Sequence, residues 1–178
     1  MTAVLKYNFD KSLTMSTTPI TLKQLKAEAI TTAAFSPFGQ VIFPAADGAS
    51  YGPQDAQLKL DEGIPRFYIM QLTGRGRRFH TITRHQRCTQ CLGALNGADW
   101  LMAVAPPGTD SDPDPETIRA FHIPGDCFIK LHVGTWHAGP LFDSQVVNFY
   151  NLELSDTNII DHHTCDLRSR YQLEFEIV

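Results

Sequence analysis

The feature that most constrains the fold is a series of short apolar runs, each about as long as a β-strand. The runs are rich in β-branched and aromatic residues, which pack well on a pleated surface. Turn-forming sequences such as GRGR, LNGAD and IPGD separate them. Short strands between frequent turns predict an all-β sandwich or barrel. The predicted strands are 67–72, 98–104, 120–123, 127–133 and 146–154.

Few segments favour a helix. Residues 20–30 contain a capping box, formed by Thr21 and Gln24, but their apolar residues also alternate as in a strand. This segment therefore stays open between helix and strand.

Two further local patterns give definite expectations. In residues 31–39 we predict a short helix that Thr32 caps and that Pro37 and Gly39 end. The Asn96-Gly97 pair predicts a hairpin turn.

Length and charge limit the domain count and the partners. The 178 residues suit one domain, which we place at 19–178 after a loose leader of residues 1–18. A formal net charge of -4 gives no reason to expect a nucleic-acid partner. No segment approaches the roughly 18 apolar residues that a membrane span requires. Four cysteines without a secretory signal predict free thiols in a reducing cytoplasm.

Histidines in two segments are the main candidates for chemistry. Side chains alternate along a strand, so an inward His85 places Thr83 on the same face and Arg84 outward, unless a bulge intervenes. Gln90 would face inward on the next strand. A small barrel leaves its mouth for a ligand, and the Gly134 turn brings His137 back toward that interior. We therefore predict that His85 and His137 face each other there.

The Cys88–Cys91 pair forms a C-x-x-C, for which we predict no chemistry. On a strand the two thiols point to opposite faces, which prevents shared zinc ligation and a disulfide. We expect both residues to act as small buried apolar side chains.

The two histidine segments resemble the paired motifs of the cupin superfamily. The first cupin motif, His-x-His followed by Glu, matches here as Thr83, His85 and Gln90. The second, Pro-x-Gly-x-x-His, matches as HVGTWH, with His132 in place of the proline and His137 as the histidine. The resemblance implies a cupin-type double-stranded β-helix, a jelly-roll barrel with a few short helices.

The resemblance is more specific at the family level, where the chain is similar to the ureidoglycolate lyase family. This family has Glu-Arg-His where the chain has Thr83-Arg84-His85, and the chain inserts Ala138-Gly139 before its Pro-Leu-Phe. The similar segments are AFSPFGQVI (34–42), RHQRCTQCL (84–92), ETIRAFHIPG (116–125), LHVGTWHAGPLF (131–142) and HTCDL (163–167).

The family resemblance implies a cytoplasmic homodimer that splits ureidoglycolate into glyoxylate and urea in allantoin breakdown. A neutral imidazole suits removal of the hydroxyl proton, and a second imidazole or a metal can stabilise the developing charge. A cation must meet the substrate carboxylate, for which Lys130 is the first candidate. The candidate catalytic residues are His85, His137 and His132, and the candidate substrate-binding residues are Lys130, Gln90, Thr83, Arg84 and Trp136.

Alternatives stay open at several of these positions. His132 serves either the site or the turn, and Trp136 lines either the pocket or the core. His162 and His163 are expected to be exposed and without a role. A divalent metal, nickel or manganese, would bind weakly to His85, His137 and Gln90, because the full cupin ligand set is absent.

Three functions compete at this stage. The first is a ureidoglycolate lyase, and the second is a non-catalytic cupin that binds a small organic acid. The third, a metal-dependent oxygenase or isomerase, is disfavoured by the incomplete ligand set.

Overall fold

The structure, a computed structural model, describes residues 19–178; the leader predicted for residues 1–18 lies outside them. Strands dominate the described part, and its helices are short. The predicted all-β class is confirmed. The sheets of residues 19–178 do not close into a continuous barrel, and their arrangement is consistent with a cupin-type jelly roll. Among these residues no helix is long and apolar enough to cross a membrane.

The first large sheet has five antiparallel strands. Its longest pair, β12 and β4, aligns residue by residue over nine positions, and β4 forms one edge. In spatial order the strands are β3 (Gly39–Ile42), β10 (Phe128–Leu131), β7 (Gln90–Ala94), β12 (Val146–Leu154) and β4 (Pro65–Thr73).

The second large sheet has six strands, antiparallel except where β2 joins β9. In spatial order they are β13 (His163–Asp166), β6 (Thr81–Arg84), β11 (Trp136–Leu141), β8 (Gly97–Ala105), β9 (Arg119–Gly125) and β2 (Ala27–Ala29).

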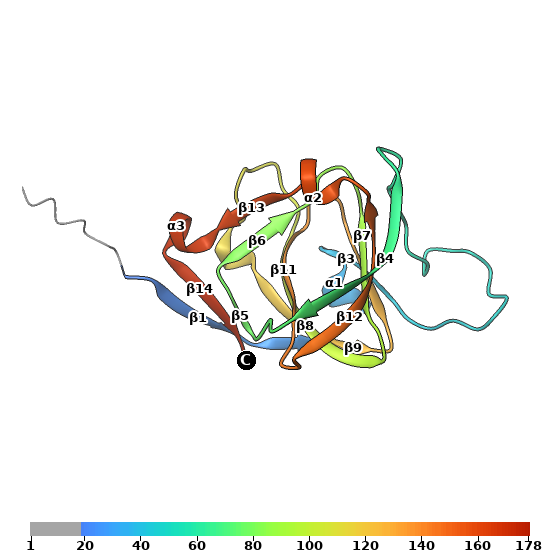
Figure 1. Cartoon of the computed structure of the whole chain (residues 1–178), viewed down its shortest axis with the longest axis horizontal. Coiled ribbons are helices and arrows are strands. Elements are labelled where there is room, and N and C mark those ends of the chain that lie inside the picture. Colours follow the sequence, from blue (N-terminus) through green and yellow to red (C-terminus); the bar gives the residue numbers. More distant parts are fainter. Residues whose placement is uncertain (1–18) are drawn as a thin grey trace, which may run out of the picture.

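A small third sheet covers the outer side of the second. It consists of β1 (Thr21–Leu25), β14 (Leu173–Ile177) and β5 (Arg78–Phe79), and Figure 1 shows β1 and β14 side by side at the left of the molecule. The helical segments are α1 (Thr32–Phe35), α2 (Thr157–Ile160), α3 (Leu167–Tyr171) and the 3-10 turn η1 (Pro115–Thr117).

Two apolar clusters hold these layers together. The central cluster fills the space between the two large sheets, and the second lies between the six-stranded and the three-stranded sheets. Strand β8 contributes to both: Trp100 and Met102 face the central cluster, while Leu101 and Ala103 face the other. Burial on both faces explains why its sequence, ADWLMAV, is almost continuously apolar instead of alternating.

The strand predictions are confirmed at all five segments, with boundaries shifted by a few residues. The segment left open at residues 20–30 forms strands β1 and β2. The predicted short helix is present as α1, but its cap is Thr31, whose side chain accepts from the Ala34 N–H, and not Thr32.

The Asn96-Gly97 prediction is correct for the turn and wrong for the hairpin. Both residues have positive φ, 60° and 69°, as a tight turn of this type requires. However, the turn leads from β7 in the five-stranded sheet to β8 in the six-stranded sheet, and these two strands do not pair. The turn therefore carries the chain across the core.

Candidate active site

His85 follows strand β6 and is fixed by Asp161. The His85 Nδ1 lies 2.6 Å from the Asp161 carbonyl oxygen, which can only accept, so Nδ1 carries the proton. The carboxylate of Asp161 accepts from the backbone N–H groups of Gln86 and Arg87, both at 2.8 Å. Asp161 thus sets both the path of the chain after β6 and the tautomer of His85.

His137 enters the site from β11. Gly134, at a φ of +82°, makes the preceding turn, and its N–H donates to the His85 carbonyl at 2.6 Å. The His137 Nδ1 donates to the Thr135 carbonyl at 3.3 Å. As predicted, the two imidazoles face each other inside the protein, with ring centroids 5.1 Å apart.

Both imidazoles are neutral bases. Burial lowers the pKa of His85, and burial together with the neighbouring His85 lowers the pKa of His137 to about 3. Because each Nδ1 donates to a carbonyl, the proton-free nitrogen of each ring is Nε2. Neither Nε2 has a hydrogen-bond partner among the described residues, so two Nε2 lone pairs are available to a ligand.

The pocket beside these rings is small and polar, with a volume of about 150 Å³. Its floor comes from the inner face of the five-stranded sheet. Gln90 donates through Nε2 to Asn151 at 3.2 Å and to Glu153 at 2.9 Å, while its buried Oε1 has no partner. The buried Glu153 carboxylate also accepts from the Tyr68 hydroxyl and from the Asn158 amide, each at 3.2 Å.

Two further residues that were not predicted as site residues line the pocket. Arg75 lines the pocket from the β4–β5 turn, where Gly74 and Gly76 on either side both have positive φ. It forms no ion pair among residues 19–178. His162 is exposed, as expected, and it also lines the pocket, with its ring centroid 5.7 Å from that of His85.

Lys130 and His132 are not in this pocket. Leu131 pairs with Gln90, whose side chain enters the pocket, whereas Lys130 pairs with Cys91, whose side chain points to the opposite face. Lys130 and His132 line a different cavity on the outer side of the sheet. Their assignment to the substrate carboxylate and to the reacting centre is therefore corrected.

Three other predicted substrate contacts also lie elsewhere. Trp136 is buried in the second apolar cluster, on the side of β11 opposite to His137, and the Arg84 guanidinium stacks over its ring at 4.5 Å. Thr83 is opposite His137 in register, but its hydroxyl bonds to that of Thr164 at 3.0 Å and it does not line the pocket. Of the predicted substrate-binding residues, Gln90 alone lines the pocket with the histidine pair.

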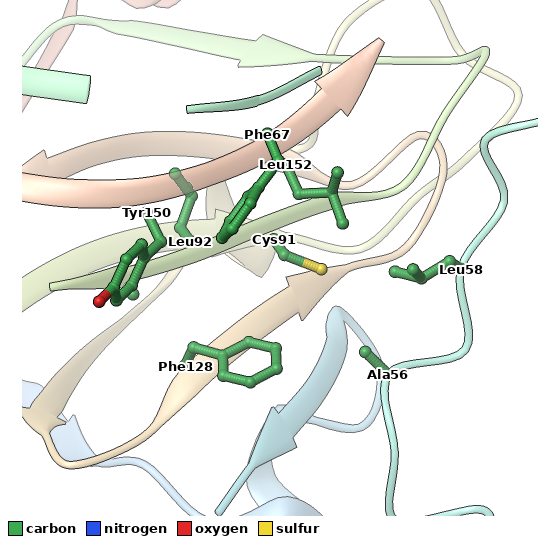
Figure 2. Close-up of a pocket in the computed structure, with 9 residues that line it drawn as sticks. Ala56, Leu58, Phe67, Cys91, Leu92, Phe128, Tyr150 and Leu152 are labelled. Atoms are coloured by element: carbon green, nitrogen blue, oxygen red, sulfur yellow. The ribbon is translucent and has the colours of Figure 1, made fainter. Parts of the chain in front are cut away.

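A larger pocket of about 370 Å³ lies on the outer face of the five-stranded sheet, and its side chains are almost entirely apolar. Figure 2 shows Phe67, Tyr150 and Phe128 around it, with the Cys91 thiol as one of its few heteroatoms. Burial raises the pKa of Cys91 to about 12, which keeps the thiol protonated at neutral pH. This pocket offers no acid–base pair, so the polar pocket is the better candidate.

The polar pocket offers only part of a metal site. Its two Nε2 atoms are suitably presented, because a hydrogen bond from Nδ1 to a carbonyl is the usual way to orient a metal-binding histidine. Within residues 19–178, however, no three His, Cys, Asp or Glu side chains come together to hold a metal ion. Gln90 adds only a neutral amide oxygen. The side chains therefore do not fit a closed metal site.

Comparisons with known proteins agree with the similarity seen in the sequence motifs. A family model described as ureidoglycolate lyase matches residues 22–173. The ureidoglycolate lyase of Azotobacter vinelandii is 27% identical over 128 residues, which cover 65% of this chain and 76% of that protein. Those of Pseudomonas paraeruginosa and Pseudomonas aeruginosa are 30% and 31% identical over 130 residues, covering 65% of this chain and 75% of each relative. The chain belongs to the ureidoglycolate lyase family.

Proposed function

We propose that this protein is a ureidoglycolate lyase, a carbon–nitrogen lyase that cleaves ureidoglycolate to glyoxylate and urea. The observation that carries the proposal is the pair of facing neutral imidazoles, His85 and His137, in a small polar pocket. The relatives named above are ureidoglycolate lyases, which supports the same substrate here.

The reaction requires a base that removes one proton from the substrate and then returns it to the leaving group. The Nε2 atom of one imidazole takes the proton of the substrate hydroxyl, and the oxygen forms the carbonyl of glyoxylate as the C–N bond breaks. The electron pair of that bond passes to the ureido nitrogen, which receives the proton from the imidazolium and leaves as urea. No water is consumed, and a neutral imidazole suits both transfers.

The floor of the pocket supplies acceptors for the ureido group, which is rich in N–H donors. Gln90 Oε1 is buried and unpartnered, and an unpaired buried acceptor is costly unless a ligand satisfies it. The Glu153 carboxylate lies beside it with no cationic partner among the described residues. We place the ureido end of the substrate against these two groups.

The substrate carboxylate then lies toward Arg75. A guanidinium can hold a carboxylate with two parallel hydrogen bonds, and Arg75 has no competing ion pair in the described part of the chain. A cavity of about 150 Å³ suits a molecule about as large as benzene. The small volume therefore favours ureidoglycolate over a longer ureido acid.

The test is product analysis with racemic ureidoglycolate. We expect urea and glyoxylate in equal amounts, above the spontaneous rate, and a rate near the spontaneous one for the His85→Ala/His137→Ala double variant. Ammonia in place of urea would indicate hydrolysis and would contradict the lyase. Substrate binding without turnover would favour the non-catalytic cupin that binds an organic acid.

We also propose that the protein works as a homodimer in the cytoplasm. Phe67, Ile69 and Tyr150 are exposed on β4 and β12 beside the apolar pocket of Figure 2, a surface that a second copy could cover. The four cysteines are free and buried, which suits a reducing compartment. Light scattering should give the molar mass of a dimer for the wild type and that of a monomer for the Phe67→Asp variant. A variant that is still dimeric would place the interface elsewhere.

A further inference from the structure

Lys130 is a buried ammonium group without a carboxylate partner. Only 3% of the residue is exposed, and its side chain lies between its register partners Gln40 and Cys91 on the outer face of the five-stranded sheet. None of the ion pairs among residues 19–178 involves Lys130. A buried charge is normally paired, because loss of its hydration is costly.

His132 is the protein partner of this ammonium, and it brings no negative charge. The Lys130 Nζ donates to His132 Nδ1 at 2.9 Å, and His132 Nε2 donates to the Ser36 carbonyl at 3.3 Å. The ring is thus neutral, and burial lowers the pKa of both His132 and Lys130. The other two N–H groups of Lys130 have no acceptor among the described residues.

These two side chains line a cavity of about 520 Å³. No acidic residue lines it, and much of its wall is apolar, including Phe43, Pro44 and Ala45. The loop of residues 43–64, which Figure 1 shows as the long excursion between β3 and β4, supplies part of the wall. Long ordered loops of this kind are usually functional.

The loop is fixed to the sheet by Gln40. Its Nε2 donates to the carbonyls of Pro53 and Asp55, both at 3.2 Å, and its Oε1 accepts from the Gln57 N–H at 2.9 Å. The Asp55 carboxylate bonds to the Gly52 N–H at 2.7 Å within the loop, and so does not neutralise the ammonium. The wall of the cavity is therefore formed before any ligand arrives.

We propose that this cavity is a second ligand site, which binds a small organic acid through its carboxylate on Lys130 and its apolar chain against the wall formed by residues 43–45. One ammonium suits a singly charged carboxylate better than a phosphate, which is usually held by several donors. The site is separate from the histidine pocket, because Lys130 and Gln90 project from opposite faces of the same sheet. The inference does not rest on the proposed lyase activity.

Calorimetric titration of the full chain with butyrate tests this site. Butyramide serves as an uncharged analogue of similar size, and inorganic phosphate serves as a second anion. We expect butyrate to bind at one site, and Lys130→Met to weaken it at least about tenfold, the loss of one charge-assisted hydrogen bond. The His85→Ala variant, altered in the other pocket, should bind butyrate as the wild type does. Butyramide should bind far more weakly.

Each of three results would overturn the proposal. The wild type does not bind butyrate, the Lys130→Met variant binds it as tightly as the wild type does, or the His85→Ala variant no longer binds it. Phosphate binding as tightly as butyrate would overturn the organic-acid assignment. If Lys130→Met does not fold, Phe43→Ser at the exposed end of the wall replaces it. This variant should weaken hexanoate more than acetate, and an equal effect on both acids would contradict the apolar wall.

Discussion

The imidazoles of His85 and His137 face each other with centroids 5.1 Å apart, and each ring donates its Nδ1 proton to a backbone carbonyl. The two rings come from different parts of the chain, and the backbone hydrogen bond from the Gly134 N–H to the His85 carbonyl joins the segments that carry them. Their spacing, tautomers and neutrality are therefore set together. The protein offers two Nε2 bases on one side of a cavity whose other side carries amide and carboxylate acceptors.

The first prediction concerns this pair. Replacing His137 by Ala should lower kcat about 10²–10⁴-fold, the usual contribution of a positioned acid or base, and His85→Ala should do likewise. His137→Asn is the matched control, because its amide can still donate to the Thr135 carbonyl but provides no base. Activity retained by a folded His137→Asn protein would show that the ring is structural.

The second prediction compares two adjacent histidines. Both histidines are exposed, but His162 lines the pocket, whereas His163 starts β13 and does not line it. His162→Ala should lower kcat/KM about tenfold, roughly the loss of one hydrogen bond to a ligand. His163→Ala should leave it within about twofold. Equal effects of the two substitutions would remove His162 from the site.

The third prediction assigns the carboxylate end of the substrate to Arg75. Arg75→Met should raise KM about 10–100-fold with little change in kcat, since a charge-assisted hydrogen bond to the bound substrate is lost. Arg77→Met is the matched control, because Arg77 lies outside this pocket and pairs with Asp143. A fall in kcat at constant KM would place Arg75 in the chemical step instead.

The positions of the strands and of the histidine pair could be predicted because both follow from local rules. The five predicted strands are apolar runs bounded by turn residues, and the glycine turn before His137 is a short-range feature. Alternation also places Trp136 opposite to His137 once His137 is inward. Of the two alternatives left open for Trp136, pocket or core, this rule selects the core.

The error at Lys130 has a similar cause. Ile129 and Leu131 flank Lys130 and face the central cluster, so alternation puts the lysine on the other face. The apolar residues on either side of the lysine could have indicated this. His132 follows the end of β10, and its contact with Ser36 depends on a segment almost a hundred residues earlier, which no local pattern predicts.

Arg75 and Glu153 could not have been assigned from the sequence alone. Arg75 is one of several arginines in a turn-rich segment, and its position at the pocket depends on two left-handed glycines and on how β4 joins the sheet. Glu153 lies in an alternating strand, where it would usually be placed on the solvent side. Its burial becomes understandable only through Tyr68, Gln90 and Asn158, which come from three different segments.

The fourth prediction concerns the metal. Because no three His, Cys, Asp or Glu side chains of residues 19–178 come together to hold a metal, nickel or manganese should bind weakly and be removed by dialysis against a chelator. Dialysed protein should keep turnover within a few-fold, and added metal should change it little. A stoichiometric metal that survives prolonged dialysis, or activity that returns only with metal, would show a ligand contributed by residues outside 19–178 or by a partner subunit.

The fifth prediction concerns stability at acidic pH. Burial keeps the pKa of His137 at about 3 and lowers that of His85, whereas in the unfolded chain both return to about 6.5. Between these values the unfolded chain binds more protons than the folded one, so the free energy of unfolding decreases as the pH falls below about 6.5.

Urea unfolding of the wild type and of His137→Asn at several pH values isolates the contribution of the ring. The wild type should lose more stability than the variant over this range, because the variant has no imidazole to protonate. Parallel curves for the two proteins would mean that His137 has the same pKa in the folded and unfolded chains, which would contradict its burial as a neutral ring.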